Sequence, residues 1–215
     1  DAPGQKGTGR WTGVAALETG TPAAAIADAV FQRFLNADVE FRRRGGELLP
    51  AGTIAAPVDV ESAVADLERA LYAAKICVYA QGFALLKAAE KEFRWPLNYG
   101  GIALLWRGGC IIRARFLNDI NAAYRRNPAL ENLLFDEFFR DELAANLPGF
   151  RRCTAAGALA GVPMPAVAGA LAYYDSCRAQ RSSGNLIQAQ RDFFGAHRFE
   201  RVDRPRGETF HAEWM

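Results

Sequence analysis

Cysteine is scarce in this sequence, and no two cysteines stand at a spacing that binds metal. The 215 residues contain four cysteines, three of them in apolar helical contexts: Cys77, Cys110, Cys153 and Cys177. A disulfide framework or a zinc site needs clustered cysteines, usually with a CxxC pair. The pattern therefore predicts reduced thiols, no metal site and a cytoplasmic protein.

Charge of a single sign is also lacking. The chain carries 26 Lys and Arg residues against 24 Asp and Glu residues, a net charge of +2. Arginine greatly outnumbers lysine, a bias that compositional drift explains, and the arginines are dispersed among acids. A near-balanced charge gives no general case for binding nucleic acid. The sequence thus predicts no nucleic-acid partner.

No leader and no membrane-spanning run is visible. A basic segment followed by an apolar one, the pattern of a secretory signal, does not open the chain. The long apolar segment at residues 59–94 is interrupted by charged residues between positions 66 and 75, too early for a membrane span. We therefore expect no membrane partner. The first residue is not methionine and residues 1–4 are typical of a loop, so we expect the chain to be part of a longer protein.

Residues 59–94 are expected to form a long helix around which the rest of the chain packs. Asp59 suits an N-cap, and Pro96 stops the helix because proline disfavours helix in the residue before it. Apolar residues recur at three- and four-residue spacing, and between Leu71 and Ala89 they cover almost every face. A helix that is apolar nearly all round belongs inside a bundle. The segment therefore predicts a buried central helix roughly 50 Å long.

The other patterns also favour helices, and no segment shows the alternation of a strand. Caps, prolines and apolar spacing predict a short helix ending at Trp106 and further helices at residues 22–41, 110–126, 129–146, 148–161, 166–178 and 185–195. Residues 42–46 are predicted to form a solvated basic turn. The sequence therefore predicts an all-α fold, a multi-helix array with a long buried central helix.

A glycine-rich stretch near the N-terminus is the first candidate site. Residues 4–12 read GQKGTGRWT, a loop whose backbone amides and Lys6 ammonium can face an anion, although the order is not that of a Walker loop. By residue type alone, an ordinary glycine-rich turn explains the stretch better. Arg33, among the apolar positions of the following helix, is likewise explained better as an edge side chain than as a ligand-binding one.

Residues 185–197 form the second candidate site. Their apolar spacing predicts a short amphipathic helix closed by Gly195 at the C′ position. Arg191 shares a face with Gln188, three residues earlier, and His197 follows the terminating glycine. An arginine with a nearby histidine can bind phosphate or carboxylate. A surface arginine and a terminal histidine without a ligand explain the pattern equally well.

Three long motifs, in this order, resemble the 6-phosphogluconate dehydrogenase family, the decarboxylating enzymes of the pentose phosphate pathway. They are GQKGTGRW at residues 4–11, NYGGIALLWRGGCIIR at 98–113 and NLIQAQRDFFGAH at 185–197. YAQGF at 79–83 and FHAEW at 210–214 agree as well, so the likeness spans essentially the whole chain. Two departures are that Arg10 replaces a usual lysine and that Ser183-Gly184 stands where Pro-Ala is common.

The resemblance implies a C-terminal helical domain that binds substrate and forms a homodimer at residues 1–198, and a tail at 199–215 that docks on the partner subunit. The family oxidises the C3 hydroxyl of 6-phospho-D-gluconate with NADP, after which the β-keto acid loses CO2. Reprotonation of the enediol gives ribulose 5-phosphate. Because the substrate carries a phosphate and a carboxylate, its pocket has to be cationic.

Site residues follow from the resemblance by matching motifs. The residues implied to bind substrate are Lys6, Thr8, Arg33 and, from the partner subunit, Arg191 and His197. The family's general-base lysine, general-acid glutamate and dinucleotide-binding domain correspond to positions upstream of Asp1, so no catalytic residue is expected in this chain. NADP is expected to bind mainly to that upstream domain. We therefore expect the isolated chain to be inactive, and to expose an apolar face where a family helix packs on residues 59–94.

Two other functions remain open. A helical dimerisation module without a catalytic role predicts no saturable binding of a sugar phosphate. A smaller β-hydroxyacid dehydrogenase relative is disfavoured, because that group resembles this chain in neither the QKGTG loop nor the QRD segment.

Overall fold

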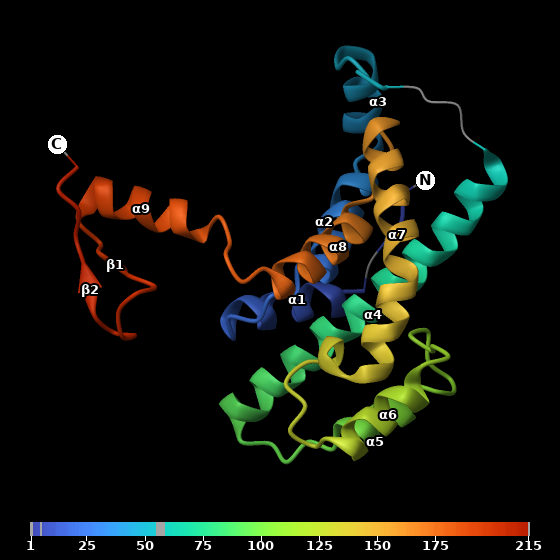
Figure 1. Ribbon diagram of the computed structural model, residues 1–215. Helices are drawn as coiled ribbons and strands as arrows, with labels where there is room; N and C mark the ends of the chain where they lie inside the picture. The colour runs from blue at the N-terminus through green and yellow to red at the C-terminus, as the bar shows by residue number, and fades with distance from the viewer. Residues whose placement is uncertain (1, 5, 55–58, 215) are drawn as a thin grey trace. The chain divides into compact units, whose positions relative to one another are not determined.

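The computed structural model describes residues 2–4, 6–54 and 59–214. They form two compact units, Asp1–Tyr174 and Asp175–Met215. The helices that begin in the first unit are α1 (Thr8–Glu18), α2 (Ala24–Ala37), α3 (Val39–Leu48), α4 (Val60–Phe93), α5 (Tyr99–Leu105), α6 (Leu117–Arg126), the 3-10 turn η1 (Leu133–Phe135), α7 (Glu137–Leu159) and α8 (Pro165–Arg178) (Figure 1). The second unit contains α9 (Gly184–Gly195) and the strands β1 (Phe199–Glu200) and β2 (Thr209–Phe210). The prediction of an all-α fold is confirmed.

The long helix α4 forms as predicted. The Asp59 carboxylate accepts a hydrogen bond of 3.0 Å from the backbone N–H of Ser62, which caps the helix N-terminus. Arg94 ends the helix in the left-handed conformation (φ 57°), two residues before Pro96. Side chains on several faces are fully buried between Ala70 and Phe83. The prediction of a buried central helix is therefore confirmed over this part of α4.

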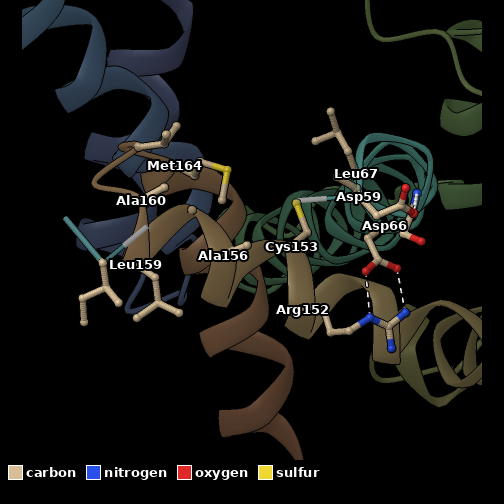
Figure 2. A pocket seen from close by; sticks show the side chains of 14 residues that line it. Asp59, Asp66, Leu67, Arg152, Cys153, Ala156, Leu159, Ala160 and Met164 are labelled. Atoms are coloured by element: carbon tan, nitrogen blue, oxygen red, sulfur yellow. Dashed lines mark hydrogen bonds and ion pairs between the residues drawn. The ribbon is translucent and has the colours of Figure 1, made fainter. Parts of the chain in front are cut away.

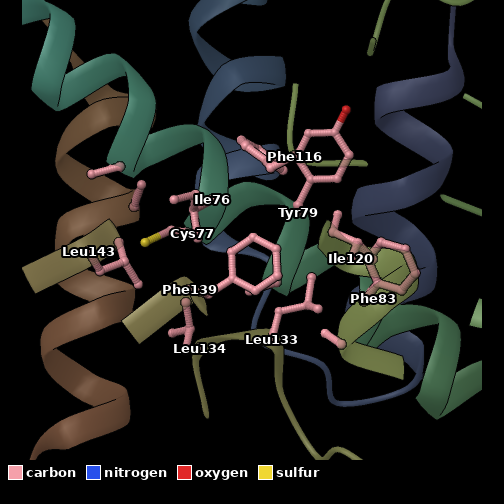
Figure 3. Packing of buried hydrophobic residues seen from close by; sticks show 14 of the residues in the cluster. Ile76, Cys77, Tyr79, Phe83, Phe116, Ile120, Leu133, Leu134, Phe139 and Leu143 are labelled. Atoms are coloured by element: carbon pink, nitrogen blue, oxygen red, sulfur yellow. The ribbon is translucent and has the colours of Figure 1, made fainter. Parts of the chain in front are cut away.

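The core of the first unit forms where α4 meets α5, α6 and α7 (Figure 3). Its largest fully buried apolar side chains are Ile76, Phe83, Leu117, Ile120, Leu133, Phe139, Leu143 and Phe150. Complete burial of such a side chain contributes about 1.5–3 kcal/mol. This packing fixes α7 along α4, and it overrides local helix propensity in α7.

In helix α7, tertiary packing outweighs the helix-breaking tendency of Pro148. The prediction that Pro148 starts a new helix is wrong, because Pro148 lies inside the continuous helix Glu137–Leu159. Phe139 and Phe150, on either side of Pro148, are both fully buried. At Gly149 an added Cβ would come within 2.7 Å of the Arg69 Cδ atom, so α7 lies very close to α4 there. Tertiary packing thus holds the helix together across the proline.

The prediction of a turn at residues 42–46 is also wrong, because these residues lie in α3. The Asp38 carboxylate accepts a hydrogen bond of 3.1 Å from the Phe41 N–H and caps α3. Arg43 forms ion pairs with Glu40 and Glu47, three residues before and four residues after it. These contacts favour a helix despite the two glycines. The same cap separates α3 from α2, so the helix predicted at 22–41 ends at Ala37.

Two further predicted helices begin later than expected. The helix predicted from residue 110 begins at Leu117, because side chains of α4 bind the carbonyl groups of the preceding turn. The Tyr79 hydroxyl donates a hydrogen bond to the Ile112 carbonyl, and the Lys75 Nζ atom donates one of 3.1 Å to the Arg113 carbonyl. The helix predicted from residue 129 begins at Glu137, whose N-cap is Asp136.

The late start at Glu137 has a local cause in the asparagine side chains that precede it. Asn127 accepts a hydrogen bond of 3.1 Å from the Ala129 N–H, and Asn132 accepts one of 2.9 Å from the Leu134 N–H. Such side-chain bonds offer the backbone an alternative to helix. The prediction of no strand is wrong for β1 and β2, whose two residues each are too few to show an alternating pattern.

Apolar side chains on the N-terminal half of α4 are exposed. Val60, Val64, Leu67 and Leu71 follow one another at helical spacing, with exposed fractions between 43% and 71%. Phe31 and Leu35 of α2 are exposed as well. Over the described part of the chain, no helix combines the length and the apolar character that crossing a bilayer requires.

Candidate functional site

Lys6, Thr8 and Arg33 line one cavity of about 350 Å³ in the first unit. Thr8 is the first residue of α1, and Lys6 lies two residues before it; Arg33 lies on α2, which packs against α1. The remaining walls are small or apolar side chains, among them Val30 of α2 and Val78 of α4. A concave, largely apolar pocket with a few converging polar groups is typical of a small-molecule site. The structure thus brings together three of the five residues that the sequence indicated.

Gly7, Thr8 and Gly9, at the start of α1, line this cavity. Gly7 precedes the helix with φ 97°, a left-handed conformation that favours glycine, and no side chain caps the helix. The first hydrogen bond within the helix is donated by Trp11 to the Gly7 carbonyl. The N–H groups of residues 8–10 therefore have no acceptor within the helix. A helix N-terminus beside an ammonium and a guanidinium group attracts an anion.

Arg33 links α2 to the segment that precedes α1. Its Nη1 atom donates a hydrogen bond of 3.0 Å to the Gly4 carbonyl. The guanidinium group has five donors, so one backbone contact leaves capacity for an anionic ligand. The prediction of a flexible loop at residues 4–12 is wrong from Thr8 onward, because these residues form α1.

Replacing Gly9 by alanine is expected to destabilise the first unit by about 1–3 kcal/mol, the range for overpacking. A Cβ atom at position 9 would lie 2.8 Å from the Val30 Cγ2 atom, so α1 and α2 would have to separate. Gly13→Ala is the matched control in the same helix, because a Cβ there meets nothing within 4 Å. It is expected to stabilise by about 0.5–1 kcal/mol. Urea denaturation measures both, and equal stability of the two variants would contradict the close packing.

Arg191 and His197 lie in the second unit, at the C-terminal end of α9. The Arg191 Nη1 atom donates a hydrogen bond of 3.2 Å to the Oε1 atom of Gln188. The prediction that Gly195 takes the left-handed position after the helix is wrong, because Gly195 is the last helical residue and Ala196 takes that position (φ 50°). His197 follows directly and is exposed.

A buried carboxylate, Asp192, organises the second unit. The Arg198 N–H, the Ala212 N–H and the Trp214 Nε1–H donate hydrogen bonds of 2.8, 3.1 and 3.0 Å to it. The His211 Nδ1 atom lies 2.9 Å from its Oδ1 atom. Burial alone raises the pKa of the Asp192 carboxyl, but these bonds, that with His211 foremost, outweigh burial and hold the pKa below its ordinary value.

Sequence reasoning missed Asp192 as a structural centre. In the segment RDFFG the aspartate follows an exposed arginine, and nothing local distinguishes a buried acid from a solvated one. Its partners at 211, 212 and 214 lie some twenty residues later, beyond the reach of helical periodicity. The aromatic residues of the tail were the available signal, because a Trp or Phe prefers burial.

A larger cavity of about 650 Å³ lies between α4 and α7 (Figure 2). Its walls are mainly apolar, with Leu67, Leu159 and Met164 among them. At its rim the Arg152 Nε and Nη2 atoms lie 2.7 and 2.6 Å from the Asp66 carboxylate, a bidentate pair that lowers the pKa of Asp66. Because this arginine is already paired with a carboxylate, the cavity suits an apolar occupant better than an anion.

No metal centre is found among the residues that the structure describes, since nowhere in them do three or more His, Cys, Asp or Glu side chains gather at binding distance. Within the part of the chain that the structure describes, none of the four cysteines is in a disulfide.

Comparison with known proteins identifies the family of this fold and sequence. The model for "6-phosphogluconate dehydrogenase, C-terminal domain" matches residues 1–214. Decarboxylating 6-phosphogluconate dehydrogenases from Dictyostelium discoideum and Mus musculus are 47% and 48% identical over the whole chain and 44% of their own length. A Bacillus subtilis relative, described as NADP(+)-dependent and decarboxylating, is 47% identical over the whole chain and 46% of its length. The chain thus spans about half the length of these relatives.

A solved structure agrees with this identification. Plasmodium falciparum 6-phosphogluconate dehydrogenase, described in its apo form and in complexes with NADP+ and with 6-phosphogluconate, superposes with a TM-score of 0.91. It is 39% identical, and the match covers 100% of this chain and 46% of that one.

Proposed function

The chain belongs to the 6-phosphogluconate dehydrogenase family, and from this premise we propose that it supplies the substrate-binding and dimer-forming half of an enzyme of this type. That enzyme converts 6-phospho-D-gluconate to ribulose 5-phosphate and CO2 with reduction of NADP. The observation that carries the proposal is the convergence of Lys6, Thr8 and Arg33 on one cavity. The named cofactor of the Bacillus subtilis relative and the two ligands of the Plasmodium falciparum structure support it.

The chemistry of the proposed substrate matches these residues. A molecule with a phosphate at one end and a carboxylate at the other needs cationic partners, because an unpaired buried anion is very costly. Lys6 offers a point charge, and Arg33 offers a planar fork that can hold two oxygens at once. The Thr8 hydroxyl and the first amides of α1 add neutral donors. Arg191 and His197 of a second copy complete the site in this proposal.

We assign no residue of this chain to NADP. Among the described residues the strands are β1 and β2, and no glycine-rich turn joins a strand to a helix in the manner of a dinucleotide fold. The cavity lining contains no carboxyl or imidazole group that could form an acid–base pair with Lys6. These residues therefore bind and orient the substrate, and we expect the 215-residue chain alone not to reduce NADP.

The alternative is a helical dimerisation module without a ligand, which the apolar face of α4 favours. The exposed side chains Val60, Val64, Leu67 and Leu71 form a continuous row that would be covered in an assembly. Self-association is expected from both proposals, so the oligomeric state does not separate them. Saturable binding of 6-phosphogluconate does separate them, because a module that only dimerises is expected not to bind a sugar phosphate.

Replacing Lys6 by glutamine is expected to weaken 6-phosphogluconate binding about 10–100-fold, the effect of losing one charge-assisted hydrogen bond. Calorimetric titration of the protein with 6-phosphogluconate measures the dissociation constant. Lys91→Gln is the matched control, since it removes the same charge from an exposed position at the end of α4. Equal dissociation constants for the two variants would remove Lys6 from the site, and no saturable binding by the unsubstituted protein would favour the alternative.

A further inference from the structure

The segment that carries His197 has an unusual backbone. Ala196 and Arg198, on either side of the histidine, both have left-handed conformations, with φ 50° and 63°. Residues with a Cβ atom adopt this region rarely and at a cost, unless surrounding contacts hold them there. Two such residues around a single histidine therefore indicate that other groups impose the orientation of His197.

Two residues of α9, Asp192 and Gln188, supply those contacts. The Asp192 carbonyl accepts a hydrogen bond of 2.8 Å from the Ala196 N–H, and its carboxylate accepts one of 2.8 Å from the Arg198 N–H. The Gln188 Nε2 atom donates a hydrogen bond to the Arg198 carbonyl. The two residues that flank His197 are thus both hydrogen-bonded to one turn of α9.

The same Gln188 side chain also holds Arg191. Its Oε1 atom accepts the hydrogen bond of 3.2 Å from the Arg191 Nη1 atom, while its amide nitrogen is engaged with Arg198. A guanidinium needs an acceptor and a carbonyl needs a donor, and a primary amide provides both at once. A carboxylate of the same shape could serve Arg191 but could not donate to Arg198.

The imidazole itself lies close to the helix end. A Cβ atom added at Gly195 would come within 3.1 Å of the His197 Cδ2 and Nε2 atoms. The ring therefore lies over the glycine, and its position depends on the backbone path that Gln188 and Asp192 fix.

We propose that Gln188 is a positioning residue that uses the two ends of one amide to fix the Arg191 guanidinium and the His197 segment in a single geometry for the anionic substrate. This inference rests on the proposed function. Ordering these two groups before binding removes the entropy cost of ordering them on binding. Gln188 is half-buried at the surface of α9, so its replacement leaves the buried Asp192 cluster in place.

The test compares Gln188→Ala with Gln190→Ala, the same change at an exposed position of the same helix. Gln188→Ala is expected to raise the dissociation constant of 6-phosphogluconate about 5–10-fold, and Gln190→Ala to leave it unchanged. In an Arg191→Gln background, Gln188→Ala is expected to raise the dissociation constant by a smaller factor than in the unsubstituted protein, because only its effect on the His197 segment remains. Gln188→Glu keeps the acceptor for Arg191. Its dissociation constant for 6-phosphogluconate is expected to lie between those of the unsubstituted protein and Gln188→Ala.

The outcomes separate this inference from the function on which it rests. If Arg191→Gln binds as tightly as the unsubstituted protein, the proposed site itself is wrong. If Arg191→Gln binds weakly but Gln188→Ala binds normally, or if the two effects simply multiply, only the positioning role is overturned. Thermal unfolding of Gln188→Ala at the same temperature as Gln190→Ala, together with weaker binding, supports positioning over a general loss of structure.

Discussion

Replacing Phe83 by alanine is expected to lower the free energy of unfolding of the first unit by about 3–5 kcal/mol, the range for truncating a buried aromatic side chain. Phe83 is 1% exposed on α4, and its ring contacts three other rings. The centroids of Tyr99, Trp106 and Tyr124 lie 6.3, 5.7 and 5.4 Å away. The substitution therefore removes both buried area and the aromatic contacts that connect α4 to α5 and α6. Urea denaturation followed by circular dichroism measures the change.

Phe41→Ala is the control for the Phe83 variant. Phe41 lies on α3 with 62% of its surface exposed, so its truncation is expected to change the free energy of unfolding by less than about 0.5 kcal/mol. A comparable loss in both variants would show that the measurement does not report the α4 core. A loss below about 1 kcal/mol for Phe83→Ala would show that the core around α4 tolerates a cavity of this size.

The sequence was most informative where local and tertiary preferences agree. In α4, the Asp59 cap, the apolar spacing and the stop before Pro96 all favour the same helix, and the structure contains it. The sequence was misleading where a decisive contact lies far away or is a side-chain bond. The carbonyl groups at 112 and 113 bind Tyr79 and Lys75, which no local pattern reveals.

The candidate site shows the same limit. Lys6 and Arg33, taken from residue type alone, were better explained as a turn residue and an edge residue; only the packing of α1 on α2 brings them to one cavity. The motifs shared with the family indicated them earlier, because such motifs retain information about distant contacts. Gln188 was noted only as a helical neighbour of Arg191, since its bond to the Arg198 carbonyl depends on the left-handed turn at the end of α9.

Two variants that each bind 6-phosphogluconate poorly are expected to restore binding when they are mixed, if the site is shared between two copies of the chain. Arg33→Gln and Arg191→Gln should each weaken binding about 10–100-fold, because each removes a charge-assisted contact. In a mixed dimer one site receives both damaged halves, and the other receives both intact ones. With random pairing, about a quarter of all sites should recover full affinity. Calorimetric titration after subunit exchange measures the number of tight sites.

A second pair of variants serves as the control, because it shows whether recovery depends on which half of the site each variant damages. Lys6→Gln and Arg33→Gln damage the same half of the site, since both residues line one cavity of one chain. In their mixed dimer every site carries one damaged half, so no tight site should appear. Recovery in the Arg33 and Arg191 pair alone follows only if the α9 end of one copy completes the α1–α2 cavity of the other. Native mass spectrometry shows whether mixed dimers have formed. If they have and no tight site appears, the site is not shared between two chains: either one chain builds it from all five residues, or the five residues do not form one site.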